Sequence, residues 1–552
     1  MNTYLRQIAD KLNNTRTYLI LTNALLVFFL ILLSNVGVLP FKGMGDFAFF
    51  TVLALILTLY RPGWGFLFSI GTIALENINL APESAGIMIR PYQLFGGLTV
   101  VAILIRWILK RINLGMIKLK RADYLIILIT VAGFVSILGA ADKGLSLKLS
   151  AILASFAFLY LLARTYIQSV DDLKKIIPFV LSSGIVIIFY GIWQNVRFMK
   201  GLESFETMPG RSNATFTEAD WLGMYLVLLL AAIYSLVYYL RNKNYYADFE
   251  ESKSILARFR ITTLNSKFLF LYIYLVLIFI LLIITVSRSA WLGAFAVTFI
   301  YLLVTLSGLS FKNWQWKSFL NQLMAVFTVL ILASAYVYTF NLTNFQLLNR
   351  IQSTSTGLQK ITIACENKDQ LEKLAQLEQV KDVDQLGQFN CRHINLEDIE
   401  SERDEGFVVA EIYRDDPNVS VRSEIYRKSW EEIKRHPILG IGWGNMGAVL
   451  GKAGDGAGLS ANDTKFQAEL NSSNIFLQVW LGSGIAGVLA FVVVWLYILV
   501  GSIKRFLQDN WEVKVAGLFI LLGLLAVLIP NMFNAGLFLG FLWLYLGLAF
   551  IE

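Results

Sequence analysis

The stretch "IITVSRSAWLGAFAVTF" (residues 283–299) places one arginine, Arg288, between two hydrophobic runs. The runs cover residues 268–286 and 289–307, and each is long enough to cross a bilayer as a helix. A guanidinium stays charged at physiological pH, and a charge inside lipid is costly. We therefore predict two transmembrane helices that meet at a membrane boundary near residues 285–289, with Arg288 facing a cavity rather than lipid.

The composition extends this pattern to the whole chain. Of the 552 residues, 56% are hydrophobic and 16% are charged, whereas soluble domains are about a quarter charged. We predict an all-α polytopic membrane protein with about 12–14 transmembrane helices. Segments 46–60, 64–80 and 514–530 are short enough to be re-entrant or partly buried. The apolar segments are 18–39, 46–60, 64–80, 91–109, 122–140, 146–165, 173–196, 219–240, 268–286, 289–307, 319–340, 474–500, 514–530 and 533–551.

The distribution of lysine and arginine predicts the topology. Basic residues collect in segments such as 110–121 and 241–267, which is typical of cytoplasmic loops. Both termini are then cytoplasmic, and the net charge of +8 reflects topology rather than nucleic-acid binding. This assignment puts three unusual stretches on the same outer side: 208–223, 287–293 and 341–473.

The long outer loop divides the chain into three parts. We predict a helix bundle over 1–340, a large periplasmic loop over 341–473, and C-terminal transmembrane helices over 474–552. The loop contains an α/β insert at about 357–415, with strands at 358–365 and 405–414 and a helix at 368–380. An amphipathic helix follows over 420–437, before the glycine-rich turn "GIGWGNMG". Cys365 and Cys391 either form a disulfide or are two buried thiols.

Several polar residues on the outer side are candidates for chemistry. Arginine suits phosphate recognition, although each of these arginines can instead reach lipid headgroups or pair with a carboxylate. Glu218 and Asp220 precede a helix, where they cap it or orient an arginine. Asn474 begins the segment that returns to the membrane, and the spacing of the two histidines predicts no metal site and no cofactor. The candidates are Arg211, Arg288, Arg422, Glu218, Asp220, His436, Glu469 and Asn474.

Four pieces of sequence together resemble a known family. They are "GRSNATFTEADWLGMYL", "TVSRSAWLGAF", "VRSEIYRKSWEEIKRHPILGIGWGN" and "NSSNIFLQVWLGSGIAG", in that order. The chain resembles the O-antigen ligase-like superfamily of bacterial membrane glycosyltransferases. That superfamily includes O-antigen ligases, polysaccharide polymerases and pilin O-oligosaccharyltransferases.

The resemblance implies transfer of a saccharide from a polyprenyl-diphosphate carrier to an acceptor hydroxyl. It implies no metal and a site on the periplasmic face of the bacterial inner membrane. The acceptor would be a glycan, a lipid or a protein. Arg211 and Arg288 would hold the diphosphate, and Arg422 would assist from the loop.

One position departs from the family pattern. Ligases of this family carry a histidine immediately before the asparagine of the return motif, and this chain has Ser473 there. A serine is not a base unaided. Glu218, Asp220, Glu469 and His436 are the alternative bases, so polymerase and other transferase activities stand beside ligase activity.

Two other classes of function compete with a transferase. A flippase or transporter should show inverted repeats and charges at mid-membrane depth. Glu76 is the main acid deep in a predicted span, and the chain has no evident repeat. A receptor or assembly factor that uses the insert to bind a partner is the third alternative.

Overall fold

The structure is a computed structural model that describes residues 15–111, 119–207, 210–244, 266–308, 314–343, 358–375, 380, 383–394, 399–415, 417–447 and 472–551. The chain divides into two compact units. Unit 1 consists of Met1–Val131, Ser150–Leu342 and Ala486–Glu552. Unit 2 consists of Ala132–Leu149 and Thr343–Ile485.

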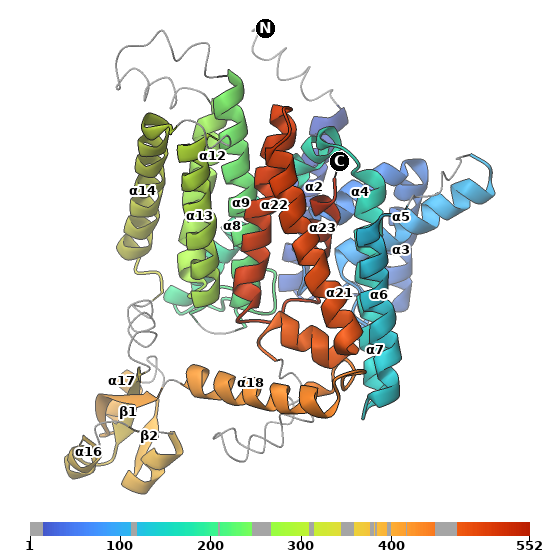
Figure 1. Cartoon of the computed structure of the whole chain (residues 1–552). Helices are drawn as coiled ribbons and strands as arrows, with labels where there is room; N and C mark the ends of the chain where they lie inside the picture. Colours follow the sequence, from blue (N-terminus) through green and yellow to red (C-terminus); the bar gives the residue numbers. More distant parts are fainter. Residues whose placement is uncertain are drawn as a thin grey trace. The chain divides into compact units, whose positions relative to one another are not determined.

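Long apolar helices make up unit 1 (Figure 1). Eleven helices in the described part of the chain are long and apolar enough to cross a membrane, and two shorter apolar helices, α3 and α23, accompany them. The prediction of an all-α polytopic membrane protein is confirmed. The helices are α2 (Thr15–Asn35), α3 (Met44–Tyr60), α4 (Pro62–Gly71), α5 (Pro91–Ile108), α6 (Arg121–Val135), α7 (Lys143–Tyr166), α8 (Val170–Met199), α9 (Ala219–Asn244), α12 (Ser266–Ile284), α13 (Arg288–Ser307), α14 (Trp316–Thr339), α21 (Ile475–Phe506), α22 (Trp511–Asn531) and α23 (Gly540–Ala549).

Three predicted segments differ from the helices that form. Segment 64–80 is helical only to Gly71, segment 533–551 only over α23, and segment 514–530, predicted to be short, is part of the full-length helix α22. After Gly71 the chain is mostly irregular up to α5, and a polar side chain in this segment bonds to nearby backbone. Asn79 Oδ1 accepts hydrogen bonds from the backbone N–H groups of Ala81 (3.1 Å) and Ile89 (2.9 Å). Such bonds hold the backbone in a non-helical path.

A fully buried carboxylate fixes this irregular segment. Glu76 Oε2 lies 3.0 Å from Arg90 Nε and accepts the Tyr92 hydroxyl at 3.0 Å, while Oε1 accepts the backbone N–H of Gly540 at 2.6 Å. Gly540 is the first residue of α23, where free N–H groups favour a negative charge. Thr215 also bonds to this segment, through Ala74 O at 2.6 Å and Asn77 N at 2.8 Å. The segment therefore supports the loop that follows α8.

The predicted α/β insert is present in unit 2. Its sheet has the order β2-β1-β3, with both outer strands antiparallel to β1. One sheet face packs on α16 and η3, because Ile361 and Ile363 of β1 form a buried cluster with Leu374 and Leu386. The predicted helix 368–380 is shorter, because Val380 forms a β-bridge with Arg414, and the predicted strand 405–414 begins at Val408. The elements are β1 (Leu358–Cys365), α16 (Lys368–Ala375), η3 (Val383–Phe389), β2 (Cys391–His393), α17 (Ile399–Asp404) and β3 (Val408–Asp415).

Cys365 and Cys391 form a disulfide, which resolves the alternative left open by the sequence. The bond joins β1 to β2 and closes a loop across a sequence separation of 26 residues. Closing a loop of this length removes entropy from the unfolded chain and stabilises the fold by about 3 kcal/mol.

Replacing both cysteines by alanine is expected to raise amide hydrogen exchange in the insert by on the order of 100-fold, which corresponds to that stabilisation. Hydrogen–deuterium exchange over residues 358–415 measures this directly. Unit 1 serves as the internal control, because its exchange should not change. Equal protection of the insert in the variant would contradict the prediction.

Unit 2 also contains Ala132–Leu149, with the end of α6 and the start of α7, and a helix, a glycine-rich turn and the start of α21 that follow the insert. Helix α18 (Pro417–Arg435) packs on α21 through Ile425, Ile433 and Leu481. Gly484 interrupts α21 with φ 66°, and a Cβ there would lie 1.9 Å from the carbonyl oxygen of Ile438. Glycine is therefore required at this position, because only it combines this φ with so close a backbone contact.

Candidate functional site

The loop between α8 and α9 is held by one buried side chain, Gln194 of α8. Gln194 Oε1 accepts the backbone N–H of Ala214 at 2.8 Å and the Ser212 hydroxyl at 3.1 Å. Its Nε2 donates to the carbonyl of Phe205 at 3.1 Å. Asn213 adds bonds to Thr207 within the loop. A buried polar network of this kind gives the loop one defined conformation.

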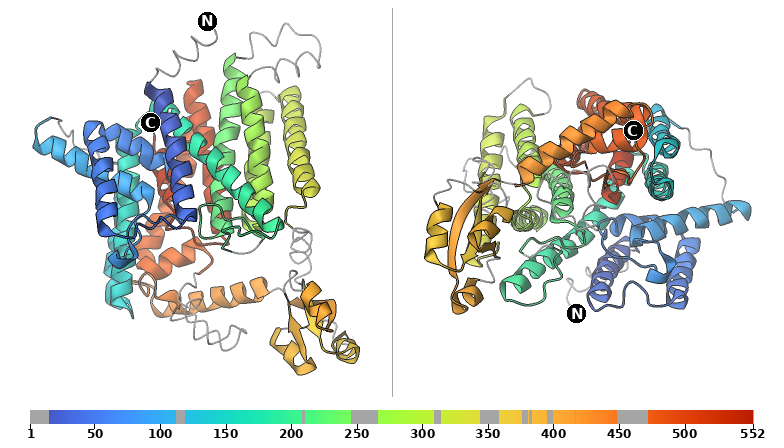
Figure 2. Two further views of the ribbon diagram at one scale, coloured as in Figure 1. Left: turned by 180° about the vertical axis from the view of Figure 1, so that it is seen from behind. Right: turned by 90° about the horizontal axis from the view of Figure 1, so that it is seen from below.

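This conformation directs Arg211 toward the junction of α12 and α13. Arg211 is 9% exposed; its Nε donates to the carbonyl of Thr285 at 3.1 Å, and its Nη2 lies 3.3 Å from Asp220 Oδ1. Asp220 therefore pairs with Arg211, whereas the sequence left open whether it caps a helix or orients an arginine. Figures 1 and 2 show the α8–α9 loop at the same end of the bundle as the junction.

The junction itself is a sharp turn between two helices. Val286 has φ 51°, and Ser287 caps α13 by accepting the backbone N–H of Ala290 at 3.4 Å. Arg288 is the first residue of α13, and Asn534 donates to the Ser289 hydroxyl at 2.8 Å. The predicted boundary at residues 285–289 is thus the break between α12 and α13.

The arrangement suits an anion. The start of a helix carries a partial positive charge and free N–H groups, and here a guanidinium lies at that start. Arg211 reaches within three residues of it through Thr285. Gly223 allows α9 to lie close to α13, because a Cβ there would be 2.5 Å from the Ala290 Cβ. Unit 1 therefore holds the Arg211 guanidinium at the α12–α13 junction, where Arg288 begins α13.

Unit 2 brings together a second group of predicted residues. The Tyr426 hydroxyl of α18 donates to the carbonyl of Ser473 at 3.1 Å. Burial raises the pKa of Tyr426, and the charge of nearby Arg422 partly opposes that shift. Asn474 caps α21, since its Oδ1 accepts the backbone N–H groups of Phe476 (2.9 Å) and Leu477 (3.2 Å). Tyr426 was not among the residues predicted from the sequence, because it follows the apolar Ile425 within an amphipathic helix and no pattern marks it.

The other predicted residues are more scattered. Glu218 is exposed, one residue before α9. His436 is exposed just after the end of α18, about 15 Å along the helix from Tyr426 at 1.5 Å per residue. Glu469 lies outside the described residues. The structure thus groups Arg211, Asp220 and Arg288 in unit 1, and Arg422 and Asn474 in unit 2.

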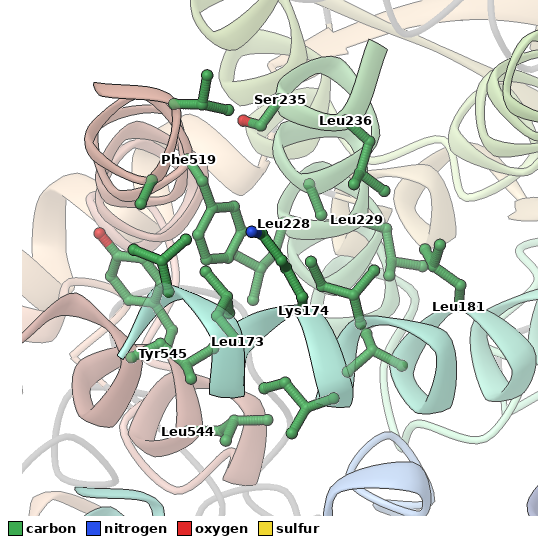
Figure 3. Close-up of a pocket in the computed structure, with 18 of the residues that line it drawn as sticks. Leu173, Lys174, Leu181, Leu228, Leu229, Ser235, Leu236, Phe519, Leu544 and Tyr545 are labelled. Carbon is green, nitrogen blue, oxygen red and sulfur yellow. The ribbon is translucent and has the colours of Figure 1, made fainter. Parts of the chain in front are cut away.

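An apolar cavity of 130 Å³ lies inside unit 1 between α8, α9, α22 and α23 (Figure 3). Leucines, Phe519 and Tyr545 form most of its wall, and Lys174 pairs with Glu512 at 2.6 Å on its edge. Phe216, in the Arg211 loop, contacts Tyr225 and Phe541 of the wall, with ring centroids 5.6 and 6.1 Å apart. One end of the cavity wall, at Tyr225 and Phe541, therefore contacts the loop, whereas Lys174 and Glu512 line its other end, near the start of α8. The cavity suits hydrocarbon, and the arginines suit an anion.

Comparison with known proteins agrees with this geometry. A family model described as O-antigen ligase matches residues 273–492, which include the α12–α13 junction, the insert, α18 and the start of α21. No curated protein matches the chain. The family match, together with the many apolar helices, supports the O-antigen ligase-like superfamily of membrane glycosyltransferases as the family of this chain.

Proposed function

We propose that the protein is a periplasm-facing glycosyltransferase that moves a saccharide from a polyprenyl-diphosphate carrier to an acceptor hydroxyl. It works in the bacterial inner membrane with both termini in the cytoplasm. The observation that carries the proposal is the hydrogen bond from Arg211 to the Thr285 carbonyl, three residues before Arg288 at the start of α13. The family match at the same junction supports it.

The chemistry explains why arginines serve here. When the bond between the sugar and the diphosphate breaks, negative charge grows on the leaving phosphate oxygen. Guanidinium groups already in place stabilise that charge most strongly in the transition state, which is what accelerates a reaction. The carbonyl of Thr285 and Asp220 hold Arg211 in position before the donor arrives, so little reorganisation is needed.

The apolar cavity, whose wall contacts the Arg211 loop at Tyr225 and Phe541, supports the proposal of a lipid-linked donor. Its wall is almost entirely hydrocarbon, which favours an isoprenoid chain over a sugar. Phe216 connects the wall to the loop that carries Arg211. A donor with its diphosphate at the arginines can therefore place part of its chain in apolar surroundings nearby.

The residues outside the arginine site receive supporting roles in this proposal. The residues proposed to bind substrate are Arg422, Asn474, Asp220 and Glu469. Glu218 and His436 are the candidates for the proton acceptor that were predicted from the sequence. The arginines supply the positive charge that a metal ion provides in other transferases, so we expect a chelator to leave the rate unchanged.

The test is transfer in proteoliposomes that contain lipid-linked saccharides extracted from cells lacking this protein. Arg211→Lys keeps the charge but loses the planar fork, and we expect it to lower transfer about 100-fold. Arg197→Lys is the matched control, because Arg197 stacks on Trp193 near the same end of α8. Equal losses in both variants would contradict the assignment of Arg211.

The same preparation distinguishes a transferase from a flippase. If the protein is a transferase, Arg211→Lys should let unreacted donor accumulate in the outer leaflet. If the protein is a flippase, Arg211→Lys should leave the donor in the inner leaflet. The Glu76–Arg90 pair favours the transferase, because the main buried acid is already neutralised by a structural partner. Retention of donor in the inner leaflet by Arg211→Lys would overturn the proposal.

A further inference from the structure

A second polar group is formed by Glu206 of the Arg211 loop and Asn195 of α8. Glu206 is half-buried and accepts the backbone N–H of Gly210 on Oε2 at 3.0 Å, one residue before Arg211. Its Oε1 is buried and has no hydrogen-bond partner among the residues that the structure describes. Asn195 of α8 is fully buried, and within those residues neither of its amide atoms has a partner.

These unsatisfied atoms lie close together. Asn195 is near enough to Glu206 to lower its pKa slightly, although no bond between them has ordinary length and angle. A buried donor or acceptor without a partner costs about 1–3 kcal/mol, so proteins rarely keep three in one place without a ligand. An amide and a carboxylate side by side match a hydroxyl group, which donates one hydrogen bond and accepts another.

The ionisation of Glu206 fits such a role. Burial raises its pKa to about 7, against small opposing effects of Gly210, Asn195 and Ser204. None of the other charged groups at the end of α8 and in the α8–α9 loop is among the causes of the shift; these groups are Arg197, Lys200, Glu203, Arg211 and Glu218. A carboxylate with a pKa near the working pH is both available as a base and strong enough to take a proton.

Resting on the proposed function, we propose that Glu206 is the proton acceptor for the acceptor hydroxyl and that Asn195 orients that hydroxyl. The hydroxyl proton passes to the Glu206 carboxylate as the acceptor oxygen bonds to the anomeric carbon. The bond from that carbon to the diphosphate oxygen breaks, and its electron pair stays on the phosphate. Glu206 then releases its proton to water. The Glu206 carboxylate accepts the backbone N–H of Gly210, the residue before Arg211, and Arg211 holds the leaving group. The hydrogen bond therefore links the base to the loop residue that binds the diphosphate.

The decisive variant is Glu206→Gln. The glutamine carbonyl still accepts the Gly210 N–H, so the loop should fold, but it cannot take a proton. We expect the transfer rate to fall by roughly 100-fold or more. Glu203→Gln is the matched control, because Glu203 is exposed in the same loop, and it should keep the wild-type rate.

The pH profile separates a catalytic role from a structural one. Wild-type transfer should fall about tenfold per pH unit below pH 7, because protonation of Glu206 removes the base. Glu206→Gln should lose this limb, while its affinity for undecaprenyl diphosphate stays unchanged. A slow variant that keeps the wild-type pH limb would show that Glu206 only positions the loop, and the proposal would be wrong.

The failure of this proposal is distinguishable from failure of the proposed function. If Glu206→Gln transfers at the wild-type rate while Arg211→Lys does not, Glu206 is excluded as the base and the glycosyltransferase stands. Glu218→Gln and His436→Gln in the same assay then identify which of the earlier candidates takes the proton. If the wild-type protein transfers no saccharide, the proposed function itself fails.

Discussion

Replacing Arg288 with lysine is expected to lower the rate of saccharide transfer by about 100-fold, and replacing it with alanine by about 1000-fold. Lysine keeps the charge at the start of α13 but presents a point charge on a flexible stem. It therefore cannot hold two phosphate oxygens in the fixed geometry of a guanidinium fork. The effect should be among the largest of any single substitution, because the charge on the leaving oxygen is greatest in the transition state.

The measurement is kcat and the donor KM in proteoliposomes. We expect kcat to fall more than KM rises, since the lost contact is strongest when the bond breaks. Arg61→Lys is a suitable control, because Arg61 stacks on Tyr60 and Trp64 between α3 and α4. A variant in which only KM changes would show that Arg288 binds the donor without assisting the chemistry.

Glu76→Ala is expected to destabilise unit 1 by about 3–5 kcal/mol, the largest stability effect that we predict. The substitution leaves the Arg90 guanidinium, which is 17% exposed, without its carboxylate. It also removes the acceptor for the Gly540 N–H at the start of α23 and for the Tyr92 hydroxyl. Each of these groups is then buried with one partner fewer.

Thermal unfolding in detergent measures this loss. Glu83→Ala is the matched control, since Glu83 is exposed in the same connection between α4 and α5 and should change stability by less than about 0.5 kcal/mol. The double variant Glu76→Ala/Arg90→Ala should lose less than the sum of the single variants, because it leaves no unpaired charge. Strict additivity would show that the two groups do not stabilise each other.

Loss of Glu76 should also weaken transfer, although Glu76 is not part of the arginine site. The segment that it fixes accepts the Thr215 hydroxyl on Ala74 O and donates from Asn77 N to Thr215 O. Thr215 follows Arg211 by four residues in the same loop. Loosening the segment therefore loosens the support of Arg211.

Much of the fold could be predicted from the sequence because transmembrane helices are specified locally. About 20 consecutive apolar residues must form a helix in lipid, where every backbone group needs an internal partner. This is why the paired runs around Arg288 gave α12 and α13, and why the alternating residues of β1 gave a strand. The same reasoning overextended segment 64–80, where the helix ends at Gly71 and Asn79 bonds to the backbone of the irregular chain that follows.

The candidate site was only partly predictable. Arg288 was identified by its charge between apolar runs, Arg211 and Arg422 by their place on the predicted outer side, and Asp220 by its place before a helix. No such pattern in the sequence marks four other residues of the site, because none of them is a lone charge between apolar runs or stands at a predicted helix start. They are Glu206, Asn195, Gln194 and Tyr426. Their importance comes from burial and from partners that the sequence does not place beside them.

The sequence by itself determined the membrane class of this protein, its helices, the insert with its two cysteines, and the family that it resembles. These properties follow from runs of neighbouring residues. Only the tertiary structure decided that Arg211 reaches Thr285, 74 residues away, and that Glu76 binds Gly540, 464 residues away. Such contacts depend on which helices pack together, because a buried charge or amide takes its partner from whatever the packed neighbours supply.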